Sequence, residues 1–212
     1  MGQLLLVRHG QASFGADDYD VLSPVGEEQA AVLGEFLVGL KPDVVVHGTL
    51  KRQQRTAEIA AQSAGWQTEL HTDERWNEID HLAITATHPK HFEGEPDARQ
   101  FQEWFERATA RWASGEYDED YTESFVEFRE RSAAALDDLL DAGTAVVFTS
   151  GGPIAALTTQ LLEAGTPTYH RLAAVVVNAS ITKVVTGRRG TTLVSFNEHG
   201  HFEGRNELLT YR

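Results

Sequence analysis

The chain contains no cysteine among its 212 residues. This absence excludes disulfides, thiolate-bound metals, iron–sulfur clusters and a cysteine nucleophile. A chain of this length buries roughly 70% of the surface that its unfolded form exposes, so its core needs no covalent cross-links. We therefore expect one compact domain over residues 1–212.

Long apolar runs are missing as well. No stretch approaches the roughly 20 apolar residues of a membrane helix. The N-terminal run Leu4–Val7 is too short for the core of a signal peptide, and no small-residue cleavage site follows it. The sequence therefore predicts a soluble, cytoplasmic protein with no membrane partner.

Basic residues are scarce, with 18 Lys and Arg against 32 Asp and Glu and a net charge of −14. Nucleic-acid binding needs basic surfaces that release counterions, so we expect no nucleic-acid partner. The excess of acidic over basic residues is concentrated in residues 73–141, which hold 19 acidic and 7 basic side chains. We interpret this stretch as solvated surface, and residues 81–120 within it as an acidic helical cap inserted into a near-neutral scaffold.

Apolar runs and helical periodicity alternate along the chain. Continuous apolar runs predict buried strands, and apolar residues spaced three and four apart predict helices. We expect strands at 3–7, 43–46, 67–70, 144–148, 172–177, 181–186 and 191–196, with a hairpin loop at 187–190, and helices at 24–40, 50–63, 104–112, 125–140 and 154–164. This order predicts an α/β fold, a three-layer α/β/α sandwich with a mainly parallel sheet.

Polar and glycine residues follow three of the predicted strands. Arg8-His9-Gly10 follows the first strand, His47 the second with Arg52 soon after it, and Ser150-Gly151-Gly152 the strand at 144–148. Ligands of open α/β sheets bind at the carboxyl ends of the strands, where helix N-termini point N–H groups at them. Arginines, a histidine and a glycine-rich helix start together predict an anion site, and we expect the anion to be phosphate.

Short motifs extend over nearly the whole chain. They are Val7-Arg8-His9-Gly10, Leu22-Ser23-x-x-Gly26-x-x-Gln29-Ala30, Leu50-Lys51-Arg52-x-x-x-Thr56-Ala57, Trp76-Asn77-Glu78-Ile79-Asp80, Ser150-Gly151-Gly152-Pro153-Ile154 and Asn178-Ala179-Ser180-Ile181. In their order and spacing the chain resembles the histidine phosphatase superfamily, which has the phosphoglycerate-mutase-like fold.

The resemblance implies a role for each matching position. His9 would be the nucleophile that forms a phosphohistidine, since an imidazole is largely neutral at pH 7. Arg8 and Arg52 would clamp the phosphate oxygens, with Ser150 and Gly151 beside them. Glu78 would protonate the leaving oxygen and then activate water. The two arginines supply the positive charge, so the resemblance implies no metal and no cofactor.

One departure from the family pattern concerns a second histidine. The usual sequence after this strand is Ser-His-Gly-Gly, whereas this chain reads Thr149-Ser150-Gly151-Gly152. Loss of a charge-assisted hydrogen bond of about 1.5–3 kcal/mol would slow transfer roughly 10- to 200-fold. This departure leaves three alternatives. Ser150 and the arginines suffice for catalysis, another histidine (His47, His199 or His201) enters the site, or the fold binds phosphate without turnover.

The reaction most consistent with these residues is hydrolysis of a phosphomonoester. The stretch 11–20 lacks the Trp-Asn and Gly-Trp pairs of the mutase members, which leaves a phosphoglycerate mutase as a weaker alternative. A binding module for a phosphorylated ligand or protein is the other alternative. His81, His88 and His91 lack a carboxylate pattern that would complete a metal site. The expected partner is a small phosphorylated substrate or a phosphoprotein, and strand 191–196 is a candidate edge for a homodimer.

Overall fold

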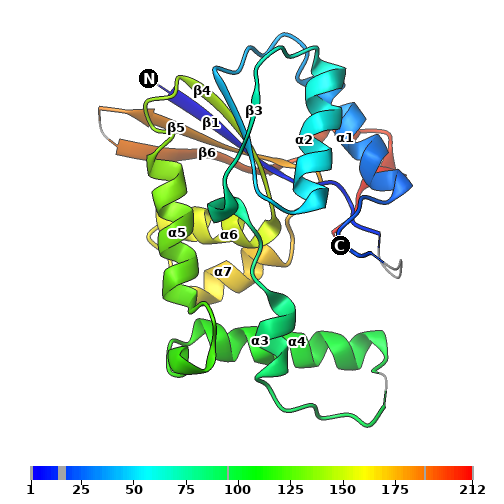
Figure 1. The fold of residues 1–212 in the computed structure, drawn as a ribbon, viewed down its shortest axis with the longest axis vertical. Coiled ribbons are helices and arrows are strands. Elements are labelled where there is room, and N and C mark those ends of the chain that lie inside the picture. The colour runs from blue at the N-terminus through cyan, green and yellow to red at the C-terminus, as the bar shows by residue number, and fades with distance from the viewer. Residues whose placement is uncertain (1, 14–17, 95, 189, 212) are drawn as a thin grey trace. The chain divides into compact units, whose positions relative to one another are not determined.

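The computed structural model describes residues 2–13, 18–94, 96–188 and 190–211, with no side-chain description for Ala98. The chain forms two compact units (Figure 1). One, the sheet unit, comprises Met1–Glu78 and Ser132–Arg212. The other, the helical unit, comprises Ile79–Arg131.

The sheet unit contains a six-stranded sheet in the order β3-β2-β4-β1-β5-β6. Its strands are β1 (Gly2–Arg8), β2 (Val44–His47), β3 (Leu70–Thr72), β4 (Thr144–Thr149), β5 (Ile181–Gly187) and β6 (Gly190–Glu198). The first four in this order pair in parallel, while β5 is antiparallel to both β1 and β6. The prediction of a mainly parallel sheet with an antiparallel hairpin at its end is therefore confirmed.

The helices begin and end close to their predicted positions. Within the described residues they are α1 (Pro24–Phe36), α2 (Lys51–Ala64), α3 (His81–Ala86), α4 (Ala98–Ala113), α5 (Phe125–Asp137), α6 (Gly151–Leu161) and α7 (Thr166–Ala173). No described helix has the length and apolar composition needed to span a bilayer. The predicted helix 104–112 starts earlier, as α4, because Asp97 and Gln100 form a capping box at its N-terminus. The short helix α3 was not expected.

Two apolar layers separate the sheet from its helices. Alternate residues of β1 point to opposite faces, so Leu5 and Val7 join a cluster with Leu33 of α1 and Ala57 of α2. Leu4 and Leu6 join a second cluster on the other face, which includes Ile154 of α6, Leu136 of α5 and Trp76. Helices thus cover both faces of the sheet, which confirms the three-layer sandwich.

The start of α1 is fixed against the loop after β1. Ser23 is the N-cap, and its Oγ accepts a hydrogen bond from the Gly26 amide at 3.0 Å. A Cβ on Gly26 would overlap the backbone carbonyl oxygen of Gln11, and a Cβ on Gly10 would overlap that of Gly26. These glycines are required by the close approach of two backbone segments. Gly10 and Gln11, which directly follow His9, therefore lie against the first turn of α1.

The predicted strand at 172–177 is wrong. Residues 166–173 form α7, which Pro167 opens at a favourable position; Val175 then lies in a turn, and Val176 and Val177 have no regular secondary structure. Val176 and Val177 are buried in different core clusters. The side chain of Asn197 bonds the Val177 amide at 2.8 Å and the Val175 carbonyl at 2.8 Å, in place of a partner strand. Burial without a strand explains the misleading apolar run.

One other boundary differs from expectation, and the predicted hairpin is confirmed. The strand predicted at 67–70 is β3 at Leu70–Thr72, where it pairs with β2. The hairpin predicted at 187–190 joins β5 to β6, with Gly187 opposite Gly190. Arg189 in that loop lies outside the described residues.

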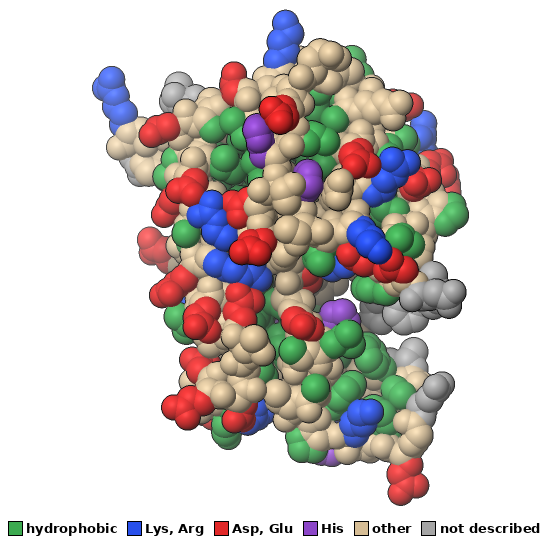
Figure 2. All heavy atoms as spheres, in the orientation of Figure 1, with side chains coloured by type: hydrophobic (Ala, Val, Ile, Leu, Met, Phe, Trp, Pro, Cys, Tyr) green, Lys and Arg blue, Asp and Glu red, His purple; other side chains and the backbone are tan. Residues whose placement is uncertain are grey.

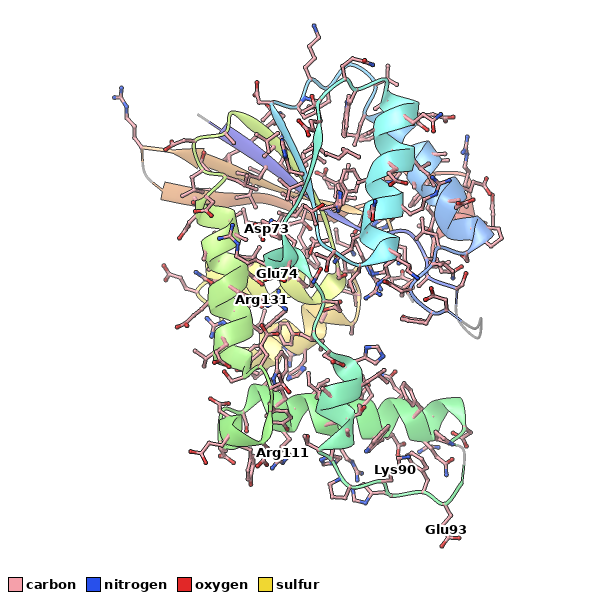
Figure 3. All side chains as sticks on the ribbon, in the orientation of Figure 1. Asp73, Glu74, Lys90, Glu93, Arg111 and Arg131 are labelled. Carbon is pink, nitrogen blue, oxygen red and sulfur yellow. The ribbon has the colours of Figure 1, made fainter. Side chains whose placement is uncertain are left out.

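The helical unit has its own aromatic core. Trp112 is buried, and its ring centroid lies 5.0 Å from that of Phe125 and 5.5 Å from that of Phe128. Arg111, labelled in Figure 3, pairs with Asp120, and its guanidinium carbon lies 3.9 Å from the ring centroid of Tyr117. On the face drawn in Figure 2, acidic side chains are spread over both units.

Candidate active site

Three neighbouring strands bring the predicted site residues to one edge of the sheet. Strand β4 lies between β1 and β2, with Arg8 opposite Thr149 and His47 opposite Phe148. The His9 amide donates to the Thr149 carbonyl at 2.8 Å. The residues that follow these strands therefore meet at the carboxyl edge, where the sequence predicted an anion site (Figure 1).

His9 is a buried, neutral imidazole with a defined tautomer. Its Nδ1 lies 2.7 Å from the Gly10 carbonyl oxygen, which only accepts hydrogen bonds, so Nδ1 carries the proton. Nε2 then holds a lone pair and accepts a hydrogen bond from Arg52 Nε at 3.2 Å. Burial, followed by the charges of Arg52 and Arg8, lowers the pKa of His9 well below its usual value. Nε2 is thus unprotonated at neutral pH, and its lone pair is engaged by Arg52 in this structure.

Arg52 lies in the first turn of α2 with 9% of its side chain exposed. Its Nη1 pairs with Asp20 Oδ1 at 2.5 Å. The other oxygen of Asp20 accepts from the Lys51 amide at 2.8 Å, since Leu50 provides no side-chain cap for this helix. A carboxylate therefore binds both the guanidinium and the helix N-terminus, two groups that favour anions.

Arg8 lies against the start of α6. Its Nη1 donates to the carbonyl oxygens of Val176 and Tyr211, the latter at 2.9 Å. Its Nε is buried and has no hydrogen-bond partner among the described residues, and a Cβ built on Gly151 would lie 3.7 Å from it. Burial lowers the pKa of Arg8 to about 10, while the nearby Glu78 favours the charged form. Arg8 is therefore a cation at neutral pH, and its Nε can donate a hydrogen bond to a ligand.

Glu78 is held at the same edge by its flanking backbone. Its Oε2 accepts a hydrogen bond from the Gly152 amide at 3.1 Å, at the start of α6. The carbonyl of the buried Trp76 accepts from Thr149 Oγ1 at 2.6 Å and from Gln53 Nε2 at 3.0 Å. The segment before Glu78 is therefore bonded to both β4 and α2.

Ser150 is fully buried, and its Oγ accepts a hydrogen bond from Gln53 Nε2 at 2.8 Å. Sequence reasoning missed Gln53, although it directly follows Arg52 on α2. Its position on the inner face of that helix was the available signal. Nothing in the local sequence pairs it with a residue 97 positions away.

The three histidines considered as replacements lie in different surroundings. His47 ends β2, beside β4, and its Nδ1 lies 2.7 Å from the Gly48 carbonyl, as in His9. His199 Nδ1 lies 2.6 Å from the Asn197 carbonyl. The ring of His201 stacks on Phe36 with centroids 5.3 Å apart, and burial lowers its pKa to about 4.

The histidines of the acidic segment form no metal site in the described structure. His88 and His91 meet edge to face with ring centroids 5.7 Å apart. Within the described ranges, no group of three or more histidine and carboxylate side chains has the arrangement needed to hold a metal ion.

Comparison with known proteins identifies the family. The sequence profile of the histidine phosphatase superfamily (branch 1) matches residues 4–199, so the chain belongs to this superfamily. The chain is 31% identical to glucosyl-3-phosphoglycerate phosphatase from Mycolicibacterium vanbaalenii, over 76% of this chain and 74% of that protein. It is 45% identical to a 2,3-bisphosphoglycerate-dependent phosphoglycerate mutase from Thermobifida fusca, but over only 31% of this chain and 30% of the mutase.

Solved structures agree with this assignment. A mutant phosphoserine phosphatase from Entamoeba histolytica, in complex with phosphoserine, superposes with a TM-score of 0.71 at 26% identity, covering 95% of this chain and 99% of that chain. A mycobacterial glucosyl-3-phosphoglycerate phosphatase superposes with a TM-score of 0.66 at 22% identity, over 93% of this chain and 99% of that one, which supports the fold alone.

Proposed function

We propose that this chain is a metal-independent phosphomonoesterase that acts through a phosphohistidine on His9. The observation that carries the proposal is the lone pair on His9 Nε2, 3.2 Å from the Nε of Arg52. A nucleophile that contacts a cationic anion-binding group is the arrangement that phosphoryl transfer needs. The net charge of −14 disfavours nucleic acid or a membrane surface as a partner, and it is compatible with a small monoester or a phosphoprotein as substrate.

In the first step, the phosphate group of the substrate binds the guanidinium groups of Arg52 and Arg8. Nε2 of His9 attacks phosphorus, and the bond between phosphorus and the ester oxygen breaks. Glu78, protonated at this stage, gives its proton to the departing oxygen, so an alcohol leaves. The imidazole ring then carries the phosphoryl group on Nε2 and a proton on Nδ1. The Gly10 carbonyl, 2.7 Å from Nδ1, stabilises the positive charge of this ring.

In the second step, water attacks the phosphohistidine. The carboxylate of Glu78 takes a proton from the water, the bond between phosphorus and Nε2 breaks, and inorganic phosphate leaves. His9 returns to the neutral form that its lowered pKa favours, with the lone pair again on Nε2. Throughout both steps the arginines stabilise the charge on the phosphoryl oxygens.

Two observations favour hydrolysis over phosphoglycerate mutase activity. A relative that matches 76% of this chain is named a phosphatase, whereas the mutase match covers 31% of the chain. The stretch 11–20 lacks the mutase residue pairs, although its residues 14–17 lie outside the described structure. A mutase must also retain its intermediate for a second hydroxyl, while a phosphatase need only admit water.

The experiment is hydrolysis of p-nitrophenyl phosphate from pH 5 to 8 in the presence of EDTA. Wild type should turn over, and His9→Ala should remove the activity. His71→Ala is the matched control, because His71 is an exposed histidine on β3. Rapid quenching into alkali should trap a phosphohistidine, detected by its ³¹P resonance, in wild type but not in His9→Ala. Phosphate binding without turnover in wild type would instead identify the chain as a binding module.

A further inference from the structure

Gln53 is a fully buried glutamine that bonds two parts of the site. We propose that it orients the hydroxyl of Ser150 so that this hydroxyl donates a hydrogen bond to the phosphoryl group. Gln53 is then a positioning residue, and Ser150 is a neutral donor in place of the family's second histidine. This inference rests on the proposed phosphatase function.

The hydrogen bonds of Gln53 fix which of its neighbours donate and which accept. The amide Nε2 of Gln53 only donates, and it has two acceptors, Ser150 Oγ at 2.8 Å and the Trp76 carbonyl at 3.0 Å. The Trp76 carbonyl only accepts, which fixes the amide with its nitrogen on this side. Ser150 Oγ therefore accepts a hydrogen bond from Gln53, and its own hydroxyl can donate to another acceptor. A phosphoryl oxygen at the edge shared with His9 is that acceptor.

The space for Gln53 is provided by a glycine on the neighbouring strand end. A Cβ on Gly48 would overlap Gln53 Oε1 and would lie 2.6 Å from Asn77 Oδ1. Gln53 Oε1 is itself buried and has no hydrogen-bond partner in the described part of the chain. A buried amide oxygen without a partner costs stability, so packing alone gives no reason for a glutamine here. The two hydrogen bonds donated by Gln53 Nε2 provide that reason.

A neutral donor has a distinct kinetic signature. An imidazole at position 150 would titrate near neutral pH, whereas a serine hydroxyl does not titrate in this range. The pH profile of kcat/KM should therefore show no ionisation from a second histidine. His47, the histidine beside β4, is the alternative candidate for the missing group.

The test compares Ser150→Ala, Gln53→Met and the double variant, with p-nitrophenyl phosphate as substrate. Each single change should lower kcat by about 10- to 200-fold, as expected for one hydrogen bond to a charged group. The double variant should be no slower than the slower single variant, because both changes remove the same donor. Ser150→Thr, which keeps the hydroxyl, should be faster than Ser150→Ala. Gln54→Met, at the exposed neighbouring glutamine, is the matched control.

Other outcomes overturn the proposal. Multiplicative losses in the double variant would show that Gln53 acts independently of Ser150, through the fold. Full activity in Ser150→Ala, with loss of activity and of a pH limb in His47→Gln, would assign the missing role to His47. Thermal unfolding of each variant identifies losses due to misfolding, and Gln53→Glu then provides a second variant, since a carboxylate would draw the Ser150 proton away from the phosphoryl group.

A failure of the proposed function is distinguishable from a failure of this inference. If wild type shows no turnover, calorimetric titration with inorganic phosphate replaces the rate measurement. Equal, non-additive losses of phosphate affinity in Ser150→Ala and Gln53→Met would support the oriented hydroxyl. Unchanged affinity in both would refute it.

Discussion

Restoring a histidine at position 150 tests how the site is packed. Ser150 is fully buried, and its Oγ is 2.8 Å from Gln53 Nε2, so an imidazole that extends in the same direction would collide with the amide. Overpacking of this kind costs about 1–3 kcal/mol. The Ser150→His variant should therefore have a lower free energy of unfolding than wild type and gain little activity.

Removing the obstructing side chain should reverse both effects. In Ser150→His combined with Gln53→Ala, the imidazole has room and supplies a charge-assisted donor of about 1.5–3 kcal/mol. Relative to the Ser150→His single variant, this corresponds to a rise in kcat of roughly 10- to 200-fold. Urea unfolding gives the stabilities, and hydrolysis of p-nitrophenyl phosphate gives the rates. If the single variant is as stable and as active as the double variant, the packing argument is wrong.

Three further predictions concern the clamp, the first loop and acid stability. Arg52→Lys should lower kcat/KM for the same ester about 10- to 100-fold, because an ammonium group lacks the planar set of donors with which the guanidinium bonds both His9 Nε2 and an anion. Unchanged kinetics would contradict this. Gly26→Ala should cost about 1–3 kcal/mol in denaturant unfolding, because its Cβ would overlap the Gln11 carbonyl, and wild-type stability would count against that contact. The pKa of His201 is lowered from 6.5 to about 4, so as pH falls below 6.5 the unfolded chain takes up this proton first and stability declines until about pH 4. The free energy of unfolding should fall by about 3 kcal/mol between pH 6.5 and pH 4, and this part of the fall should be absent in His201→Phe. An equal fall in both proteins would contradict the prediction.

The layers of the fold were predictable because their signals are local. Buried parallel strands appear as short apolar runs, and Ser23 with Pro24 marks the start of α1 as the structure has it. The valines at 175–177 show the limit of this reasoning. Their backbone is satisfied by the side chain of Asn197, about 20 residues away, and no pattern within the run itself distinguishes this from a strand.

The positions of the candidate site residues were predictable for a different reason. His9, Arg52 and Ser150 follow strand ends or open helices, and parallel strands bring such positions to one edge. Their partners were not predictable. Asp20, which pairs with Arg52, lies in a loop, and its contact depends on how that loop folds against the start of α2.

The serine at position 150 makes physical sense only together with two other positions. Gly48 lies after β2, Gln53 on α2 and Ser150 after β4, so the three come from separate elements that meet at one edge. A side chain on Gly48 would displace the Gln53 amide, and without that amide the Ser150 hydroxyl loses the donor that orients it. An imidazole at position 150 in turn conflicts with Gln53. The exchange of an imidazole for a hydroxyl is therefore a change in a packed group of three residues, and single substitutions toward the family pattern should be less favourable than combined ones.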